Sequence, residues 1–343
     1  MNVEGLAMKT SPTIVVTNRC FPETVDMLSS VGTVIVNDSD EPWPDAELAA
    51  RCGDADAMLT FMTDRIDGRL LESCRRLKIV AAALKGYDNI DIAAAAQAGV
   101  WVTIVPDLLT VPTAELAVAL MLAVGRHIVA ADQAIRDRGF RGWRPTFYGR
   151  GIAGATVGIV GYGSVGRAIA RCLSGFGCRL LATDSNASPR HETAAEDAKL
   201  VTFDALIAAS DYVVLALPLT TQTMHILNRN AIARMKPGAL LINPARGSLV
   251  DEEAVADALA SGHLAGYAAD VFQCEDWARP DRPRGIDPRL TARGAPTVLT
   301  PHIGSAVTDV RREIELSAAR SVVDVLSGRV PADAVNSPRR LRP

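Results

Sequence analysis

A glycine-rich turn between an apolar segment and a helical one constrains the fold of this chain most strongly. Residues 156–160 are apolar and largely β-branched, and the spacing G-x-G-x-x-G follows them from Gly161 to Gly166. Glycines at this spacing allow a tight turn and let backbone N–H groups approach a pyrophosphate at the N-terminus of the next helix. The motif alone is a weak signal, but here its flanks also match a strand–turn–helix unit. It predicts a dinucleotide-binding α/β domain.

An acidic residue follows the next expected strand. Residues 179–183 form an apolar run that ends at Asp184, at roughly the 20-residue distance from the glycines that an adenosine ribose requires. A carboxylate there accepts hydrogen bonds from the ribose hydroxyls and repels a 2′-phosphate. We therefore expect NAD in preference to NADP.

Short β-branched runs alternate with helical patterns along most of the chain, which favours parallel α/β architecture. The 343 residues are enough for two domains. We expect one long helix over 114–133, a loop rich in Gly, Arg and aromatic residues over 139–151, and a final helix over 309–326. The first 108 residues and the last 40 each look incomplete, so they could form one domain that the middle of the chain interrupts.

Composition excludes several classes of partner. The net charge of −3, with both signs scattered, gives no electrostatic reason to expect nucleic acid. No apolar run is long enough to span a bilayer, and no signal peptide is evident, so a cytoplasmic protein is expected. The six cysteines show neither a C-x-x-C pair nor zinc-ligand spacing, so we expect no metal.

Three ionisable residues each follow an apolar run in the same predicted domain. Arg246 follows 239–243 and is flanked by Ala and Gly, where a guanidinium could clamp an anion with two hydrogen bonds. His302 can serve as an acid or base near neutral pH, and a carboxylate such as Glu275 would fix its tautomer. Each would more often be structural if taken singly. Together, at the edge where α/β sheets bind ligands, they predict an active site.

These residues resemble a known family, the D-isomer-specific 2-hydroxyacid dehydrogenases. The resemblance keeps the motif order over nearly the whole chain and implies that Arg246 binds the substrate anion, His302 is the acid/base and Glu275 pairs with His302. It also implies a homodimer and an interrupted layout. The expected fold is a Rossmann-type NAD domain over 109–303, inserted in a smaller flavodoxin-like substrate domain formed by 1–108 and 304–343. The motifs are GYGSVG (161–166), NPARG (243–247), Asp270 with Glu275, and PHIG (301–304).

Within that family, other segments resemble the phosphonate dehydrogenases, which oxidise phosphite to phosphate. Many relatives carry a small backbone-dominated anion loop where this chain has Leu84, Lys85 and Gly86, and a lysine there adds a second cation that suits a dianion. The chain departs from this resemblance at two positions. Asp184 stands where the longer glutamate is expected, and Thr308 stands where a second arginine is expected. The segments are FMTDR (61–65), ALKGYDN (83–89), VPDLLTVPTAEL (105–116), GYAADVF (266–272) and EDWAR (275–279).

The resemblance implies a full set of site residues for phosphite oxidation. His302 would take a proton from the water that attacks phosphorus, while hydride leaves to NAD. The catalytic residues would be Arg246, Glu275, His302 and Lys85. The substrate would contact Met62, Leu84, Lys85, Gly86, Trp143, Tyr148, Arg246 and Arg311. The cofactor would contact Thr113, Gly161, Gly163, Ser164, Val165, Gly166, Asp184, Leu217, Pro218, Pro244, Ala245, Arg246, Asp270, His302 and Gly304.

Two alternatives remain open from the sequence. A reductase of glyoxylate, hydroxypyruvate or another 2-keto acid would use the same Arg, Glu and His, with no need for Lys85. A non-catalytic protein like the C-terminal-binding corepressors would share the fold and use the nucleotide to control assembly, although such proteins carry longer tails.

Overall fold

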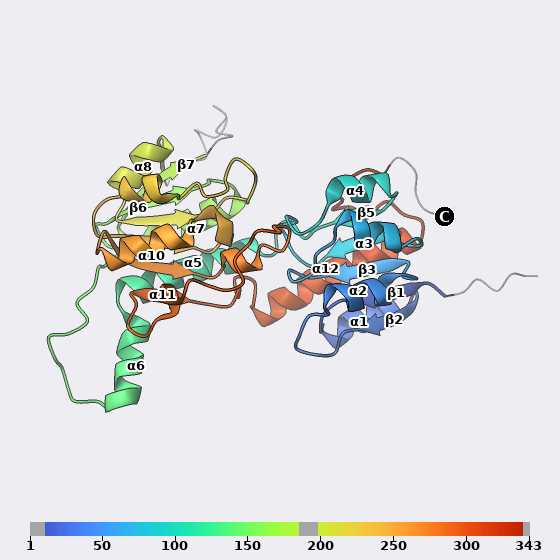
Figure 1. Ribbon diagram of the computed structural model, residues 1–343, viewed down its shortest axis with the longest axis horizontal. Helices are drawn as coiled ribbons and strands as arrows, with labels where there is room; N and C mark the ends of the chain where they lie inside the picture. The colour runs from blue at the N-terminus through green and yellow to red at the C-terminus, as the bar shows by residue number, and fades with distance from the viewer. Residues whose placement is uncertain (1–10, 185–197, 339–343) are drawn as a thin grey trace, which may run out of the picture. The chain divides into compact units, whose positions relative to one another are not determined.

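The computed structural model describes residues 11–184 and 198–338, which divide into two compact units. Unit 1 consists of the chain up to Leu109 and from Val307 onward, and unit 2 runs from Thr110 to Ala306. Each unit contains one parallel sheet with helices on both faces (Figure 1). The predicted class of two parallel α/β domains is confirmed.

Unit 1 is built on five short parallel strands. In chain order its elements are β1 (Thr13–Val16), α1 (Pro22–Ser29), β2 (Thr33–Val36), α2 (Asp45–Cys52), β3 (Ala57–Thr60), α3 (Gly68–Ser73), β4 (Ile79–Ala82), α4 (Ile92–Gln97), β5 (Trp101–Thr103) and α12 (Thr308–Leu326). The strands lie in the order β2-β1-β3-β4-β5. Both faces of β3 and β4 are buried, which explains their unbroken runs of small and apolar residues. Helices α1 and α12 cover one face, and α2, α3 and α4 cover the other.

Unit 2 contains the larger sheet. Its elements are α5 (Thr110–Gly125), α6 (Ile128–Arg138), β6 (Thr156–Val160), α7 (Ser164–Leu173), η1 (Ser174–Phe176), β7 (Arg179–Thr183), β8 (Lys199–Leu200), α8 (Phe203–Ala209), β9 (Tyr212–Leu215), α9 (Arg229–Ala233), β10 (Ala239–Asn243), η3 (Gly247–Leu249), α10 (Glu252–Ala260), β11 (Leu264–Ala269), η4 (Gln273–Glu275), α11 (Pro288–Thr291) and β12 (Thr297–Leu299). The strand order is β12-β11-β10-β9-β6-β7-β8. Helices α5 and α7 pack on one face, and α8, α9, α10 and α11 pack on the other.

The prediction of one helix over 114–133 is wrong, because the helix breaks after Gly125. Helix α6 leaves α5 at an angle of 58°. The carbonyl of Gly125 accepts the backbone N–H of Arg150, and a Cβ at Gly125 would lie 2.4 Å from the Tyr212 hydroxyl. His127 then adopts a left-handed conformation with φ 54°, which cannot continue a right-handed helix. Gly125 is a local signal for this break, but the partners that fix it, Tyr212 and Arg150, lie elsewhere in the sequence.

Neither a single spanning helix nor a metal cluster is found within residues 11–184 and 198–338. No helix there is long and apolar enough to cross a membrane alone, and α5 and α6 meet that test only as a bent pair. No group of three or more His, Cys, Asp or Glu side chains there is arranged to hold a metal ion.

Candidate active site

The glycine turn after β6 is shaped for a phosphate group. Gly161 has φ +95°, and a Cβ there would lie 2.5 Å from the carbonyl oxygen of Ala216. A Cβ at Gly166 would lie 2.1 Å from the carbonyl oxygen of Gly161, so close packing excludes side chains at both positions. A Cβ at Gly163, by contrast, would meet no atom within 4 Å. Packing therefore does not require Gly163, and the open space beside this turn, at the N-terminus of α7, fits a pyrophosphate.

Asp184 lies beside the same turn. Its Oδ2 accepts the backbone N–H of Tyr162 at 3.2 Å, which fixes the carboxylate at the end of β7. The carboxylate is half-buried and so keeps a face toward solvent. This position suits an acceptor for the adenosine ribose hydroxyls. The residues present thus fit NAD, which supplies a hydride donor or acceptor when bound.

The other candidate cofactor residues lie at the C-terminal edge of the same sheet. Thr113 is in the first turn of α5, and a Cβ at Gly304 would lie 3.5 Å from its hydroxyl. Leu217 and Pro218 follow β9, which ends at Leu215. Pro244 and Ala245 follow β10. Ligands of open parallel sheets bind along this edge.

A buried asparagine at the end of β10 shapes the turn that carries Arg246. The Asn243 side chain donates to the carbonyl oxygen of Arg246 at 2.8 Å and accepts the N–H of Ala245 at 3.2 Å. The next residue, Gly247, lies so close to Phe272 that a Cβ would be 1.9 Å from the Phe272 carbonyl carbon. These contacts fix the backbone on both sides of the half-buried Arg246.

Glu275 and His302 are brought together although they follow different strands. His302 Nδ1 lies 2.9 Å from Glu275 Oε2, and Glu275 Oε1 accepts the backbone N–H of Phe272 at 2.7 Å. Both side chains are partly exposed, at 30% for His302 and 24% for Glu275. Because Nδ1 faces the carboxylate, Nε2 is the ring nitrogen suited to exchange a proton with a substrate.

Asp270 holds the turn that carries His302. It is 1% exposed, and its carboxylate accepts the Thr300 hydroxyl at 2.6 Å and the N–H groups of Ile303 and Gly304 at 2.8 Å each. Burial raises the pKa of Asp270, and these hydrogen bonds oppose that rise. His302 itself has φ 55°, a strained conformation for a residue with a side chain. The Asp270 contacts stabilise that backbone.

Arg246, Glu275 and His302 follow β10, β11 and β12, three neighbouring strands of one parallel sheet. Parallel strands end at the same edge, so this order gathers a cation, a carboxylate and an imidazole at one edge of unit 2. At such an edge an arginine can bind an anionic group, and a histidine oriented by a carboxylate can move a proton.

In unit 1, the segment after β4 carries the candidate anion loop. Leu84 is buried, and its carbonyl oxygen accepts the N–H of Val105 at 2.9 Å. Lys85 and Gly86 are half-buried. Burial lowers the pKa of Lys85, while the Asp107 carboxylate opposes part of that shift. Met62, after β3, is also half-buried.

Arg311 reaches the same segment from α12. Its Nη1 donates to the carbonyl oxygen of Ala83 at 3.0 Å, and its guanidinium lies over the Phe61 ring, 5.2 Å from the centroid. Glu315, one turn further along α12, approaches Arg311 Nε at 3.4 Å. The structure thus brings Arg311 to the backbone that leads into Lys85.

Trp143 and Tyr148 lie elsewhere in unit 2. The two side chains are 78% and 75% exposed. They belong to residues 139–149, which together with α6 extend away from the body of unit 2 (Figure 1). We call α6 and residues 139–149 the arm. Within this chain, the arm does not bring either aromatic side chain to His302 or Glu275.

Several supporting residues were not found from the sequence. Asn243 and Glu252 form hydrogen bonds beside the site of unit 2, and Asp64 and Glu315 accept backbone hydrogen bonds within unit 1. A polar residue that ends an apolar strand is a usable signal for Asn243. Glu315 is spaced i+4 from Arg311 on a predicted helix, which is a second usable signal. No signal marks Asp64 or Glu252, because Asp64 accepts from the Thr17 hydroxyl and Glu252 from the Gln273 backbone, and both of these partners are distant in the sequence.

The fold and this site define an NAD-dependent oxidoreductase. The family model "D-isomer specific 2-hydroxyacid dehydrogenase, NAD binding domain" matches residues 118–304. A glyoxylate reductase of Thermococcus onnurineus is 37% identical over 330 residues, covering 95% of this chain and 96% of the relative. The chain therefore belongs to the D-isomer-specific 2-hydroxyacid dehydrogenase family.

Solved structures agree with this assignment. The TT0316 protein of Thermus thermophilus is similar with a TM-score of 0.84 and 34% identity, covering 94% of this chain and 100% of that one. A glyoxylate reductase from Paecilomyes thermophila has a TM-score of 0.81 and 28% identity, covering 95% and 98%. These comparisons support the family and not the narrower resemblance to phosphonate dehydrogenases.

Proposed function

We propose that this chain catalyses hydride transfer between NAD and a small anion, with a 2-keto acid and its D-2-hydroxy acid as the substrate pair. The contact between His302 and Glu275 is the observation that carries this proposal. In the reductive direction, His302 Nε2 donates a proton to the carbonyl oxygen, and Glu275 stabilises the charged imidazolium. Arg246 binds the carboxylate of the substrate. The relatives named glyoxylate reductase favour glyoxylate and similar acids.

The proposal assigns different tasks to the two units. Residues 109–303 would bind NAD through the glycine turn and Asp184, with NAD preferred because Asp184 repels a 2′-phosphate. Residues 1–108 and 304–343 would bind the substrate through Met62, the segment 84–86 and Arg311. The absence of a spanning helix in the described residues and the family fold are compatible with a cytoplasmic enzyme.

A second candidate is the oxidation of phosphite, and Lys85 is the observation that favours it. A half-buried ammonium group in the anion loop adds positive charge, and phosphite carries more negative charge than a monocarboxylate. In this reaction a water oxygen bonds to phosphorus as the P–H bond breaks. His302 takes the proton of the water, and the hydride is accepted by NAD⁺. Arg246 and Lys85 would stabilise the phosphoryl oxygens.

One experiment separates these candidates. Purified protein is given NAD⁺ with phosphite, D-glycerate or D-lactate, and NADH with glyoxylate or hydroxypyruvate, and kcat/KM is measured for each. The 2-keto acid proposal expects the highest value with a keto acid and none with phosphite. NADH formation with phosphite, and with neither of the hydroxy acids, would contradict the 2-keto acid proposal and support the second candidate. Turnover of none of these substrates, with NAD bound, would favour the non-catalytic alternative.

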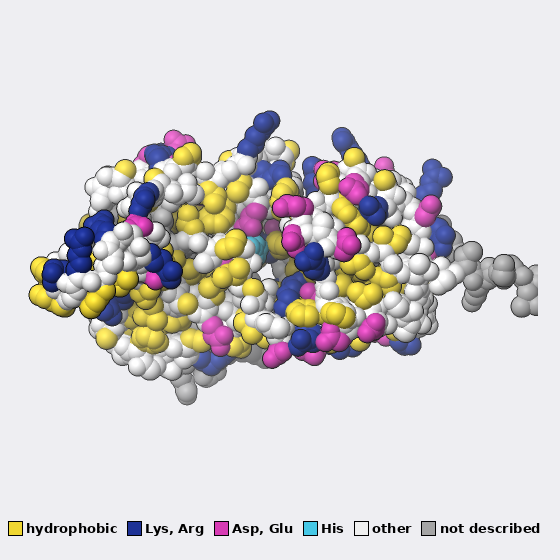
Figure 2. Space-filling model, turned by 90° about the horizontal axis from the view of Figure 1, so that it is seen from below, with side chains coloured by type: hydrophobic (Ala, Val, Ile, Leu, Met, Phe, Trp, Pro, Cys, Tyr) yellow, Lys and Arg dark blue, Asp and Glu magenta, His cyan; other side chains and the backbone are white. Residues whose placement is uncertain are grey.

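We also propose a homodimer in which a second copy covers the arm. No residue of α6 is buried, and large apolar side chains on the arm are exposed: Ile128, Val129, Ile135, Phe140, Trp143, Phe147 and Tyr148. Apolar and basic side chains gather on the side of unit 2 from which the arm protrudes (Figure 2). A contiguous apolar surface of this kind marks an interaction site.

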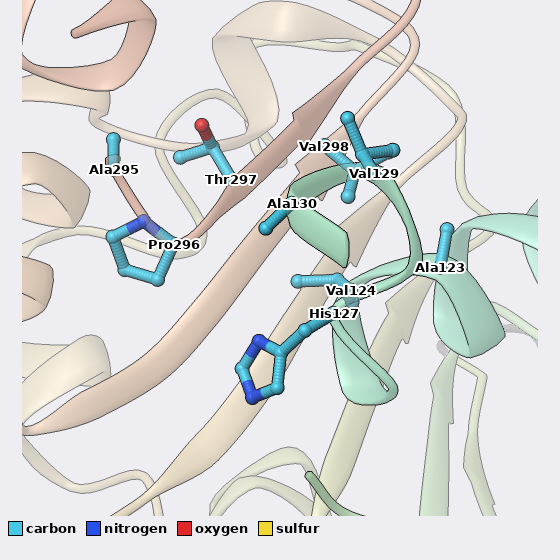
Figure 3. A pocket seen from close by; sticks show the side chains of 9 residues that line it. All are labelled: Ala123, Val124, His127, Val129, Ala130, Ala295, Pro296, Thr297 and Val298. Carbon is cyan, nitrogen blue, oxygen red and sulfur yellow. The ribbon is translucent and has the colours of Figure 1, made fainter. Parts of the chain in front are cut away.

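A small pocket at the bend between α5 and α6 continues this apolar surface. His127, Val129 and Pro296 are among the residues that line it (Figure 3). A second copy is also the simplest way for Trp143 and Tyr148 to line a substrate pocket, as the resemblance implies. Sedimentation of the wild type and of a variant lacking 139–149 tests the dimer, and a wild-type monomer would contradict it.

A further inference from the structure

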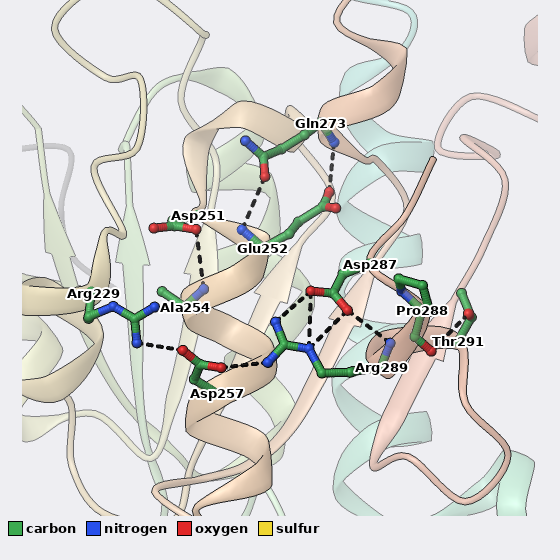
Figure 4. A network of polar contacts seen from close by, with 10 residues as sticks. All are labelled: Arg229, Asp251, Glu252, Ala254, Asp257, Gln273, Asp287, Pro288, Arg289 and Thr291. Atoms are coloured by element: carbon green, nitrogen blue, oxygen red, sulfur yellow. Dashed lines mark hydrogen bonds and ion pairs between the residues drawn. The ribbon is translucent and has the colours of Figure 1, made fainter. Parts of the chain in front are cut away.

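A buried carboxylate supports the turn that carries Glu275. Glu252 begins α10 and is 3% exposed. Its Oε1 accepts the backbone N–H of Gln273 at 2.6 Å, and the Gln273 side-chain Oε1 accepts the backbone N–H of Glu252 at 3.2 Å. These reciprocal hydrogen bonds join the first residue of α10 to the first residue of η4 (Figure 4). Glu275 is the last residue of η4.

The orientation of the Gln273 amide is fixed at its other end. Its Nε2 lies 2.8 Å from His225 Nε2. An amide nitrogen can only donate, so this His225 nitrogen accepts a hydrogen bond in this arrangement. The amide oxygen faces the backbone N–H of Glu252, which can only donate, so turning the amide would break that contact. The side chain of Gln273 thus has one satisfied orientation.

The same turn also contacts the segment that follows Arg246. Asp276, directly after η4, accepts the backbone N–H of Ser248 at 2.8 Å, and Arg279 donates to the Ser248 hydroxyl at 2.6 Å. The backbone of Gly247 lies against Phe272 with no room for a Cβ. Movement of η4 would therefore disturb both the proton-transfer pair and the Arg246 segment.

Burial of the Glu252 carboxylate removes it from water, which has a desolvation cost. Burial raises the pKa of Glu252, the Asp276 carboxylate adds to the rise, and backbone hydrogen bonds from Gln273 and Asp287 oppose it, which leaves the pKa at about 7. A glutamine or an apolar residue would avoid the cost of a buried carboxylate.

We propose that Glu252 is a positioning residue that fixes η4 through Gln273, so that the Glu275 carboxylate stays within hydrogen-bonding distance of His302. This inference rests on the proposed function, which assigns proton transfer to that pair. Glu252 acts through the backbone of η4 and does not contact the substrate or cofactor.

The test compares Glu252→Ala, which removes the acceptor, with Glu252→Gln, which keeps an acceptor oxygen. Asp257→Ala is the matched control on the same helix, because Asp257 forms ion pairs with Arg229 and Arg289 at the surface (Figure 4). We expect Glu252→Ala to lower kcat by about 10- to 100-fold with little change in KM, since a small misplacement of a catalytic group is costly. Glu252→Gln should retain most of the rate, and Asp257→Ala should match the wild type.

A second measurement needs no substrate. The downfield imidazole N–H resonance of His302, assigned by its absence in His302→Asn, reports the Nδ1 contact with Glu275. We expect this resonance to broaden or disappear in Glu252→Ala and to remain in Glu252→Gln. If the wild type turns over no substrate, the proposed function fails, and the resonance still decides whether Glu252 positions Glu275.

A normal kcat and an unchanged His302 resonance in Glu252→Ala would overturn the inference. Equal impairment of the Gln and Ala variants, with the resonance intact in both, would also overturn it and show that the charge matters elsewhere. If Glu252→Ala does not fold, Gln273→Ala removes the side-chain half of the reciprocal pair. That variant must then show the loss of kcat and of the resonance.

Discussion

The imidazole Nδ1 of His302 lies 2.9 Å from Oε2 of Glu275, although 27 residues separate the two positions. The contact forms because β11 and β12 are neighbours in the sheet and both residues follow the same edge. Buried Asp270 shapes the turn of His302, and η4 shapes the turn of Glu275. The pair is therefore held by two separate parts of the backbone, and each can be perturbed independently.

Replacing Glu275 with Gln should lower kcat by roughly 100-fold or more, because the neutral amide no longer stabilises a charged His302. The affinity for NADH, measured by its fluorescence, should remain near that of the wild type. His302→Asn should be at least as impaired. A Glu275→Gln enzyme with more than half of the wild-type kcat would contradict the proton-transfer role of the pair.

Arg246→Ala should lower kcat/KM by about 10²- to 10³-fold, whichever anion is the substrate, since one aligned hydrogen-bond donor to a reacting anion contributes this much. Arg246→Lys keeps the charge but loses the planar fork and should recover only part of the loss. NAD binding should change little. Near-normal turnover by Arg246→Ala would remove Arg246 from the substrate site.

Lys85→Met should distinguish the two candidate substrates, because it removes the charge and keeps an unbranched side chain of similar length. A dianion should lose far more affinity than a monocarboxylate. Burial lowers the pKa of Lys85, so its charge is lost at a lower pH than for an exposed lysine. The KM for phosphite should accordingly rise as the pH becomes alkaline in the wild type. Equal effects on phosphite and glyoxylate would show that Lys85 does not discriminate between them.

Asp184→Asn should weaken the discrimination between NAD and NADP by roughly 10-fold, because it removes a negative charge from the position of the 2′-phosphate. The asparagine can still accept the Tyr162 N–H, so the glycine turn should keep its shape. The ratio of kcat/KM for the two cofactors is the measurement. An unchanged ratio would mean that other residues set the preference.

Asp64 should make unit 1 less stable as the pH rises. It is 3% exposed, and burial raises its pKa from 3.8 to about 6, against hydrogen bonds from Phe61 and Thr17. The folded protein therefore keeps this proton where the unfolded chain has lost it, and the free energy of unfolding falls between about pH 4 and pH 6. The full effect is up to about 3 kcal/mol. Urea unfolding of wild type and Asp64→Asn across this range should show the difference growing with pH, and parallel curves would contradict it.

Much of the fold follows from local sequence patterns. Strands buried on both faces read as apolar runs, so the β3, β4, β6 and β10 segments could be recognised individually. The glycine spacing predicts the turn after β6 because steric contacts at Gly161 and Gly166 exclude any Cβ. The candidate acid, base and anion-binding residues could be named because each directly follows such a strand.

What the sequence determined by itself was therefore local: which segments form strands, where a phosphate-binding turn lies, and which ionisable groups end strands. The tertiary structure alone decided that β10, β11 and β12 are neighbours, that the helix breaks after Gly125, and that Glu252 accepts the Gln273 N–H at the start of η4. These features depend on contacts between segments far apart in the chain. Periodicity records which face of an element is apolar, and it carries no information on which distant backbone group will meet it.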